Sequence, residues 1–300
     1  MQASNLASRR RHATHIAATI FLAPALLFLI IFIGYPILDS FRISTLEWNG
    51  ISAHRTFIGL DNWGALLRDR NFWAAFRNNL TIMVFSLLFQ VPFALALATF
   101  LDAGGKKFNL FKVVWFFPLL MSSVAVGFLF RYALDANFGL FANISRLLGG
   151  SGAIDLLGDP NRALFAVIGV ICWQYIPFYM VYYLAGYSGL SEDTYEAAII
   201  DGATRGQYFW RVALPQLFPT IRSGAILSIV GSLKFFDLIF VMTGGGPGTA
   251  TELMGTYMYR NAFMTFRMGY GSAVACGMFI LITMIALIAM KLLSGKEAGA

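Results

Sequence analysis

The chain has 300 residues, of which 58% are hydrophobic and only 12% are charged, and its mean hydropathy is +0.68. Soluble domains average about 45–50% apolar and about 25% charged residues, so the composition excludes an ordinary soluble domain and predicts an all-α polytopic membrane protein. The formal net charge of +7 does not indicate nucleic-acid binding, because the basic residues are scattered among apolar segments. Contact with the anionic headgroups of membrane lipids is the simpler explanation.

Six apolar runs are each long enough to cross a bilayer, since about 20 helical residues at about 1.5 Å rise span a hydrocarbon core of about 30 Å. The predicted spans are 16–37, 80–101, 113–132, 163–184, 223–242 and 270–292. They divide the chain into an N-terminus (1–15), a six-helix membrane domain (16–292) and a C-terminal tail (293–300). The first run is longer than the 7–15 apolar residues of a signal peptide, so we expect it to be retained as a helix.

The distribution of Lys and Arg favours cytoplasmic termini. Eleven of these residues fall on the side of the two termini and nine on the other side. The positive-inside rule, by which Lys and Arg are enriched on the cytoplasmic side, weighs short loops most. Both the triplet Arg9-Arg10-Arg11 and the lysine-rich loop 102–112 favour the same orientation.

The longest polar stretch in the second half of the chain begins at Ser191. Ser191 can cap a short helix, which Gly202 would end or bend. Thr204 and Gln207 have the spacing of a capping box, so a second helix is predicted to start there. We expect this second helix to end at Pro215, which lacks a backbone donor.

Three short motifs lie in this stretch: Glu196-Ala197-Ala198, Asp201-Gly202-Ala203 and Leu214-Pro215. They resemble the EAA signature of the membrane-spanning subunits of ATP-binding-cassette (ABC) importers. The resemblance implies that loop 186–222 is cytoplasmic and that its first helix is the coupling helix, which docks on an ATPase. The residues to which it assigns coupling are Glu196, Ala197, Ala198, Asp201, Gly202, Arg205, Leu214 and Pro215. An amphipathic helix lying on the membrane surface is the alternative interpretation.

A second informative segment carries Lys234 and Asp237 inside an apolar run. A charge near the membrane centre costs about 2.5–3.5 kcal/mol, so both side chains should face protein or water. Their i, i+3 spacing permits a mutual ion pair, and the pair is therefore either structural or part of a binding site. The following run Thr243-Gly244-Gly245-Gly246-Pro247 cannot stay helical and predicts a loop.

This segment, together with Phe57-Ile58-Gly59-Leu60-Asp61-Asn62-Trp63, resembles the larger, first-type permease subunit of maltose-type carbohydrate importers. The resemblance implies a type I ABC importer permease core in the bacterial inner membrane. The implied partners are a second homologous permease, two ATPase subunits that bind ATP and Mg, and a periplasmic or lipid-anchored substrate-binding protein. The chain itself is expected to hold no metal or cofactor. It is also expected to be no enzyme, because Gly104-Gly105-Lys106 lacks the Walker A spacing of an ATPase.

In that family the substrate lies midway across the membrane, against the fourth and fifth helices. The positions that the resemblance assigns to the substrate are Gln174, Tyr175, Phe178, Ser228, Ser232, Lys234 and Phe235, with Asp237 beside them. Aromatic faces stack on the C–H surfaces of sugars, while hydroxyl and amide groups bond sugar hydroxyls. Packing within the bundle is the alternative role of each residue. Lys234 also leaves room for an anionic ligand, such as a phosphorylated or sulfonated glycerol or sugar derivative.

Two other functions compete with this interpretation. An ion-gradient-driven secondary transporter could use Lys234 and Asp237 as its coupling groups. A membrane-embedded enzyme would need a catalytic constellation, and the sequence has neither paired carboxylates nor the HExxH or GxSxG patterns.

Overall fold

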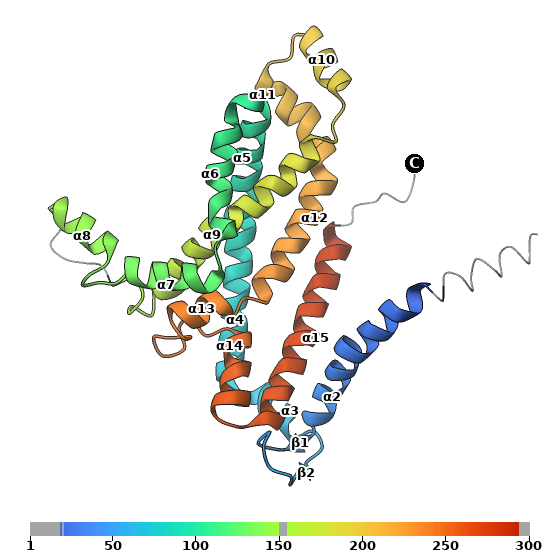
Figure 1. Cartoon of the computed structure of the whole chain (residues 1–300), viewed down its shortest axis with the longest axis vertical. Helices are drawn as coiled ribbons and strands as arrows, with labels where there is room; N and C mark the ends of the chain where they lie inside the picture. The colour runs from blue at the N-terminus through green and yellow to red at the C-terminus, as the bar shows by residue number, and fades with distance from the viewer. Residues whose placement is uncertain (1–18, 20, 150–154, 294–300) are drawn as a thin grey trace, which may run out of the picture. The chain divides into compact units, whose positions relative to one another are not determined.

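The computed structural model describes residues 19, 21–149 and 155–293 (Figure 1). The predicted N-terminus 1–15, with its arginine triplet, lies outside the described residues, as does the tail from residue 294. The chain divides into two compact units. Unit 1 contains Met1–Arg68 and Arg260–Gly277, and unit 2 contains Asp69–Tyr259 and Met278–Ala300.

Unit 1 joins the first apolar helix to two loops that are distant in sequence. Its elements are the helix Phe21–Ile43, which includes η1 (Ile30–Gly34) and α2 (Tyr35–Ile43), then β1 (Leu46–Glu47), β2 (Thr56–Phe57), α3 (Asp61–Arg68), η5 (Arg260–Met264) and the beginning of α15 (Met268–Leu293). The strands pair antiparallel, with Leu46 opposite Phe57. The Gly269 N–H donates to the Trp48 carbonyl at 3.1 Å, so the two loops are bonded to each other.

This bond between Trp48 and Gly269 also fixes the number of membrane crossings. The two residues lie on one side of the membrane, so an even number of crossings must separate them. The apolar helices between them are Arg70–Gly104, the bent pair Asn109–Leu120 and Ser123–Ala133, Ala163–Tyr187 and Arg205–Leu233. The count is even only if the bent pair makes one crossing, which gives six crossings together with the first and last helices.

Unit 2 is a helical bundle built around α9. Its elements are α4 (Arg70–Phe85), η2 (Ser86–Gln90), α5 (Val91–Gly104), η3 (Gly105–Phe108), α6 (Asn109–Leu120), α7 (Ser123–Ala133), α8 (Leu140–Leu147), α9 (Ala163–Tyr187), α10 (Glu192–Ile200), α11 (Arg205–Tyr208), η4 (Phe209–Ala213), α12 (Leu214–Leu233), α13 (Asp237–Met242) and α14 (Met254–Tyr259). Helix α9 packs on α5, α6 and α12. One half of α9 buries Ile171 with α7 and α13, and the other half buries Met180 and Tyr183 with α5 and α12.

Four of the six predicted spans are confirmed as long apolar helices, and the other two predictions need correction. The run 113–132 is not one straight helix, because α6 and α7 meet at an angle of 93°. Met121 and Ser122 between them are extended, and the Ser122 hydroxyl caps α7 by accepting from the Val124 N–H at 3.3 Å. The run 223–242 is also broken: α12 ends at Leu233 and α13 starts at Asp237.

The predicted helix end at Pro215 is wrong, and the reason recurs in the fold. The π-helical segments η1, η2 and η4 each precede a proline by two residues: Pro36, Pro92 and Pro215. A proline ring lacks a donor and crowds the carbonyl of the preceding turn. A wider π-turn relieves that crowding without ending the helix. The helix therefore runs without interruption from Arg205 to Leu233.

Candidate substrate cavity and coupling loop

The site begins with the break between α12 and α13, where Lys234, Phe235 and Phe236 connect the two helices. A broken helix leaves carbonyl groups unpaired, and inside a bilayer these need a protein partner. Asn79 of α4 supplies it: its Nδ2 donates to the carbonyls of Ser232 (3.4 Å) and Leu233 (3.3 Å). Its Oδ1 accepts from the Met254 N–H at 2.9 Å. One fully buried amide thus holds three backbone groups.

Asn78, the neighbouring residue, fixes the loop that follows α13. Its Nδ2 donates to the carbonyls of Thr249, Ala250 and Glu252. Neither asparagine was among the residues predicted from the sequence. Two adjacent amides near the start of an apolar helix are a usable signal, because polar residues within membrane helices are expensive and mostly functional.

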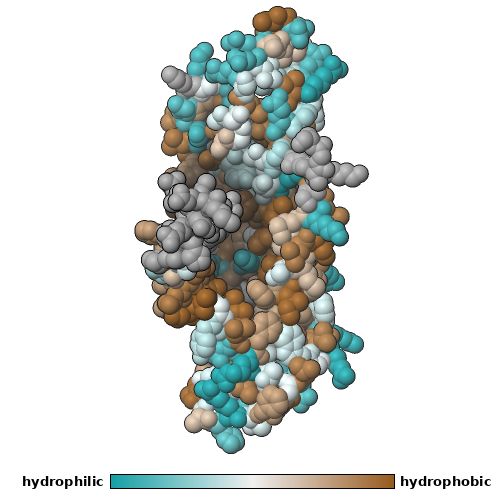
Figure 2. All heavy atoms as spheres, turned by 90° about the vertical axis from the view of Figure 1, so that its right-hand side faces the viewer, coloured by the Kyte–Doolittle hydropathy of each residue, from teal (hydrophilic) through white to brown (hydrophobic). Residues whose placement is uncertain are grey.

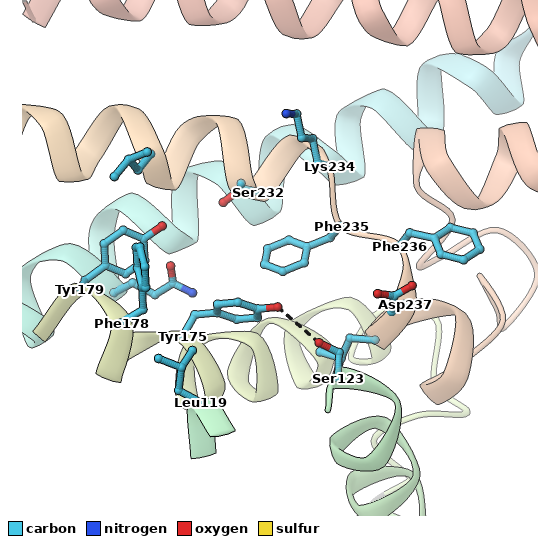
Figure 3. A pocket seen from close by; sticks show the side chains of 14 residues that line it. Leu119, Ser123, Tyr175, Phe178, Tyr179, Ser232, Lys234, Phe235, Phe236 and Asp237 are labelled. Carbon is cyan, nitrogen blue, oxygen red and sulfur yellow. Dashed lines mark hydrogen bonds between the residues drawn. The ribbon is translucent and has the colours of Figure 1, made fainter. Parts of the chain in front are cut away.

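A cavity of about 390 Å³ lies beside this break (Figure 3). Of the eight residues predicted to contact the substrate, six line it: Tyr175, Phe178, Ser232, Lys234, Phe235 and Asp237. Helices α7, α9 and α12 and the connection after α12 contribute its walls. The structure therefore brings most of the predicted residues into one cavity, and their contact with a substrate stays a prediction.

Aromatic rings form one wall of the cavity. The rings of Tyr175 and Phe235 meet edge to face at 5.3 Å between centroids. The Tyr175 hydroxyl is 3.4 Å from the Ser123 hydroxyl at the start of α7, as the dashed line in Figure 3 shows. Phe178 is 41% exposed, so its ring remains accessible on the bundle surface. Ser123 is a lining residue that the sequence analysis did not find.

Gln174 and Ser228 lie outside the cavity lining. Gln174 is buried, and its Nε2 donates to the Met121 carbonyl at 3.3 Å, which serves the break between α6 and α7. Ser228 is buried beside Tyr179. Both positions fit the alternative of bundle packing that the sequence left open.

Lys234 and Asp237 both line the cavity, and both side chains are exposed. The ion pair that their spacing permits is not formed: within the described part of the chain, no salt bridge joins them. The i, i+3 argument fails because α12 ends before Lys234 and α13 begins at Asp237, so the two residues do not share a helical turn. In Figure 3 their side chains point in different directions.

Gln90 is a second lining residue that the sequence analysis missed. It ends the π-turn η2 and is only 2% exposed. Its Nε2 finds no partner among the described residues beyond the thiol of Cys172, which is a weak acceptor. A buried amide donor of this kind is available to a ligand in the cavity.

The loop with the EAA-like motifs folds as two short helices, α10 and α11. Gly202 has φ +79°, so it ends the first helix as predicted. The capping box is confirmed: Thr204 Oγ1 accepts from the Gln207 N–H, and the Gln207 side chain accepts from the Thr204 N–H. Ser191 occupies the N-cap position of α10, but its side chain makes no capping hydrogen bond, contrary to prediction.

This loop presents an open surface. Helix α10 has no buried residue, and Glu196, Asp201, Gly202 and Arg205 are exposed. Of the other predicted coupling residues, Ala197 and Pro215 are exposed, and Ala198 and Leu214 are half-buried. In Figure 2 the end of unit 2 that carries α10 and α11 is mostly hydrophilic, with a small hydrophobic cluster at its tip. Ile200, 84% exposed, ends α10.

The ring of Tyr195 meets the ring of Tyr208 edge to face at 4.9 Å and so fastens α10 to α11. Tyr187, at the end of α9, shares a 2.7 Å hydrogen bond with Thr99 of α5. The base of the loop is therefore attached to helices that continue into the bundle.

Six membrane crossings, a cavity at a helix break and an exposed helical loop define the chain as a membrane transport subunit. Residues 90–297 match the family described as the binding-protein-dependent transport system inner membrane component, and the chain belongs to this family.

Relatives and solved structures agree with this assignment. The chain is 34% identical to the probable ABC transporter permease protein YurN of Bacillus subtilis, over 93% of this chain and 96% of the relative. It is 31% identical to the multiple sugar-binding transport system permease protein MsmF of Streptococcus mutans, over 91% and 93%. A chain of a bacterial ABC transporter involved in the import of the acidic polysaccharide alginate superposes with a TM-score of 0.79 at 25% identity, over 94% and 98%.

The resemblance to the carbohydrate-type permeases of ABC importers is thus confirmed. This family assignment decides against the alternative of an ion-gradient-driven secondary transporter. It identifies a multi-pass membrane protein whose relatives are permease subunits.

Proposed function

We propose that this chain is the permease subunit of an ATP-driven importer for a sugar or sugar derivative. The observation that carries the proposal is the cavity beside the α12–α13 break, which combines aromatic rings with hydroxyl and amide groups. Two similar proteins, a permease of a multiple sugar-binding transport system and a transporter involved in alginate import, support the same substrate class.

The cavity suits a sugar because its aromatic rings match the apolar C–H faces of a sugar and its polar groups match the sugar hydroxyls. The rings of Tyr175 and Phe178 offer flat apolar faces to the C–H groups of a pyranose. The hydroxyls of Ser123 and Ser232 and the amide of Gln90 offer donors and acceptors to its hydroxyls.

A finer proposal concerns an anionic substrate. Lys234 lines the cavity and has no salt-bridge partner among the described residues. An anionic group on the substrate could accept a charge-assisted hydrogen bond from Lys234. Asp237 on the same cavity would then bond neutral hydroxyls of the substrate.

Transport needs partners in this proposal. The exposed α10 would dock on one of two ATPase subunits, which bind ATP and Mg. A second homologous permease would complete the pathway, and a periplasmic or lipid-anchored binding protein would deliver the substrate. The chain would lie in the bacterial inner membrane with both termini cytoplasmic, since the loop of α10 must face the ATPase.

The test is substrate-stimulated ATPase activity of the complete transporter in proteoliposomes. Tyr175→Ala should raise the sugar concentration for half-maximal stimulation by about 2- to 10-fold, as expected from losing one ring contact. Tyr132→Ala is the matched control, because Tyr132 is 72% exposed and does not line the cavity. Uptake that continues without the ATPase but collapses with an uncoupler would contradict the proposed function.

A further inference from the structure

A second cavity, also of about 390 Å³, lies at the far ends of α7 and α13. Its polar lining comes from Arg131, Asp135, Asn137, Asp155 and Thr243, together with backbone of the glycine-rich loop. The loop between the third and fourth predicted spans contributes three of these residues, Asp135, Asn137 and Asp155. By the count of crossings, this cavity opens on the side of the membrane opposite to α10.

An apolar wall separates the two cavities. Ser123 and Leu238 line the first cavity, whereas Arg131 and Met242 line the second, so they occupy opposite ends of the same two helices. Helices α7 and α13 approach so closely that a Cβ on Gly127 would lie 2.9 Å from the Val241 side chain. The two helices are therefore closely packed between the cavities, and the second cavity is a separate site.

The carboxylates of the second cavity are held in place by backbone donors. Asp135 Oδ1 accepts from the N–H groups of Phe138 (2.9 Å) and Asn137 (2.8 Å), which keep the pKa of this carboxyl below its usual range. Asp155 Oδ1 accepts from the Gly158 N–H at 2.7 Å. Each carboxylate thus uses one oxygen for its own turn and keeps the other for a ligand.

Arg131 adds a fork of donors to the same space. Among the described residues, it forms no salt bridge with Asp135 or Asp155, although all three line one cavity. Three charged groups that share a cavity without pairing retain their hydrogen-bonding capacity for something that enters it.

The opposite wall is rigid. The Thr243 and Thr251 hydroxyls are 2.7 Å apart, and the Thr251 hydroxyl donates to the Gly246 carbonyl at 2.8 Å. Asn78 fixes the chain on either side of Thr251. A wall held in this way needs little ordering when a ligand binds, which favours affinity.

We infer that this second cavity is an outer subsite for a neutral sugar unit, occupied before the substrate passes the α7–α13 wall. Planar carboxylate, guanidinium and amide groups can each bond two neighbouring hydroxyls. Two carboxylates against one arginine disfavour an acidic group at this position. The inference rests on the proposed function, since it assigns a second contact for the same class of substrate.

The test is protection of an introduced cysteine from alkylation in the complete transporter. Asn137→Cys reports on the second cavity and Ser123→Cys on the first, in a background with Cys172→Ala and Cys276→Ala that retains sugar-stimulated ATPase activity. Asn143→Cys, exposed on α8 and outside the cavity lining, is the control. The probes are maltotriose, raffinose, arabinotriose and a trisaccharide of uronic acids, each without the binding protein.

A neutral trisaccharide that stimulates the ATPase should slow alkylation at Asn137→Cys at least about 5-fold and leave Asn143→Cys unchanged. Adding Arg131→Gln should raise the concentration for half-maximal protection about tenfold. Protection at Ser123→Cys alone would overturn the inference and leave the proposed function intact. Protection by calcium alone, or only with the binding protein docked, would also overturn it. If no sugar stimulates the ATPase even when the binding protein is present, the proposed function falls and this inference falls with it.

Discussion

Asn79 allows a sharp test of how the cavity is built, because one buried side chain holds the break between α12 and α13. The perturbation is Asn79→Leu, which keeps the approximate size of the side chain and removes its polar atoms. Asn79 is 0% exposed and makes three hydrogen bonds, to the carbonyls of Ser232 and Leu233 and to the Met254 N–H.

The magnitude follows from these three bonds. The two donations at 3.4 and 3.3 Å share one amide nitrogen, so together they contribute about 1 kcal/mol. The Met254 N–H, bonded at 2.9 Å, would be left buried without a partner, at a cost of about 1–3 kcal/mol. Asn79→Leu should therefore lower the free energy of unfolding by about 2–4 kcal/mol, which lowers the melting temperature by about 5–15 °C.

The assay is the amount of monodisperse protein that remains after stepwise heating in detergent, measured by size-exclusion chromatography. Thr81→Val on the same helix is the matched control, since the only hydrogen bond of the Thr81 hydroxyl to any described residue goes to the Arg77 carbonyl of its own helix. That change should stay within about 0.5 kcal/mol. A melting temperature for Asn79→Leu equal to that of Thr81→Val would refute the role of Asn79 at the break.

Two further predictions concern the proposed site and loop. Glu196→Lys and Gly202→Asp should leave the chain inserted in the membrane but lower ATP-dependent uptake at least about tenfold, because both change the exposed surface of α10 or its end; normal uptake in both variants would contradict docking there. Lys234→Met should weaken uptake of an anionic substrate about tenfold and of a neutral one less than about twofold. Equal losses for the two substrates would count against an anion partner for Lys234.

The membrane helices could be predicted from the sequence because the bilayer imposes one simple requirement on each of them. Any helix that crosses needs about 20 apolar residues, and hydropathy reports that length directly. The breaks could not be predicted in the same way. The run 223–242 is apolar throughout most of its length, and what allows it to break is Asn79, a residue about 150 positions earlier in the chain.

At Pro215 the sequence predicted a helix end that the structure does not contain. Local chemistry predicts that a proline ends a helix, yet η4 widens by one residue per turn and the helix continues. Pro36 and Pro92 also lie inside apolar runs, and each of them follows a π-turn as Pro215 does. This recurrence is a signal that the sequence contains.

Only part of the candidate site could be predicted, because two neighbouring residues of one helix face different surroundings. Tyr175 lines the cavity, whereas Gln174, one residue earlier, points to the α6–α7 break. A rotation of about 100° per residue decides such a difference, and it depends on how α9 packs. Gln90 was missed because it comes from a third helix, which the motifs did not connect with the cavity.

The continuous helix from Arg205 to Leu233 gives the proposed loop and the cavity a direct mechanical connection. Its 29 residues span about 43 Å. Gly224 marks a close approach of α12 to α9, because a Cβ there would lie 2.5 Å from the Tyr183 hydroxyl. If the helix tilts about this contact, the arm towards Arg205 is about 28 Å long and the arm towards Leu233 about 14 Å. A displacement of the loop would then move the end of α12, with Ser232 and Lys234, about half as far in the opposite direction. Loss of docking in Gly202→Asp would therefore remove the movement of the cavity wall without touching the cavity itself.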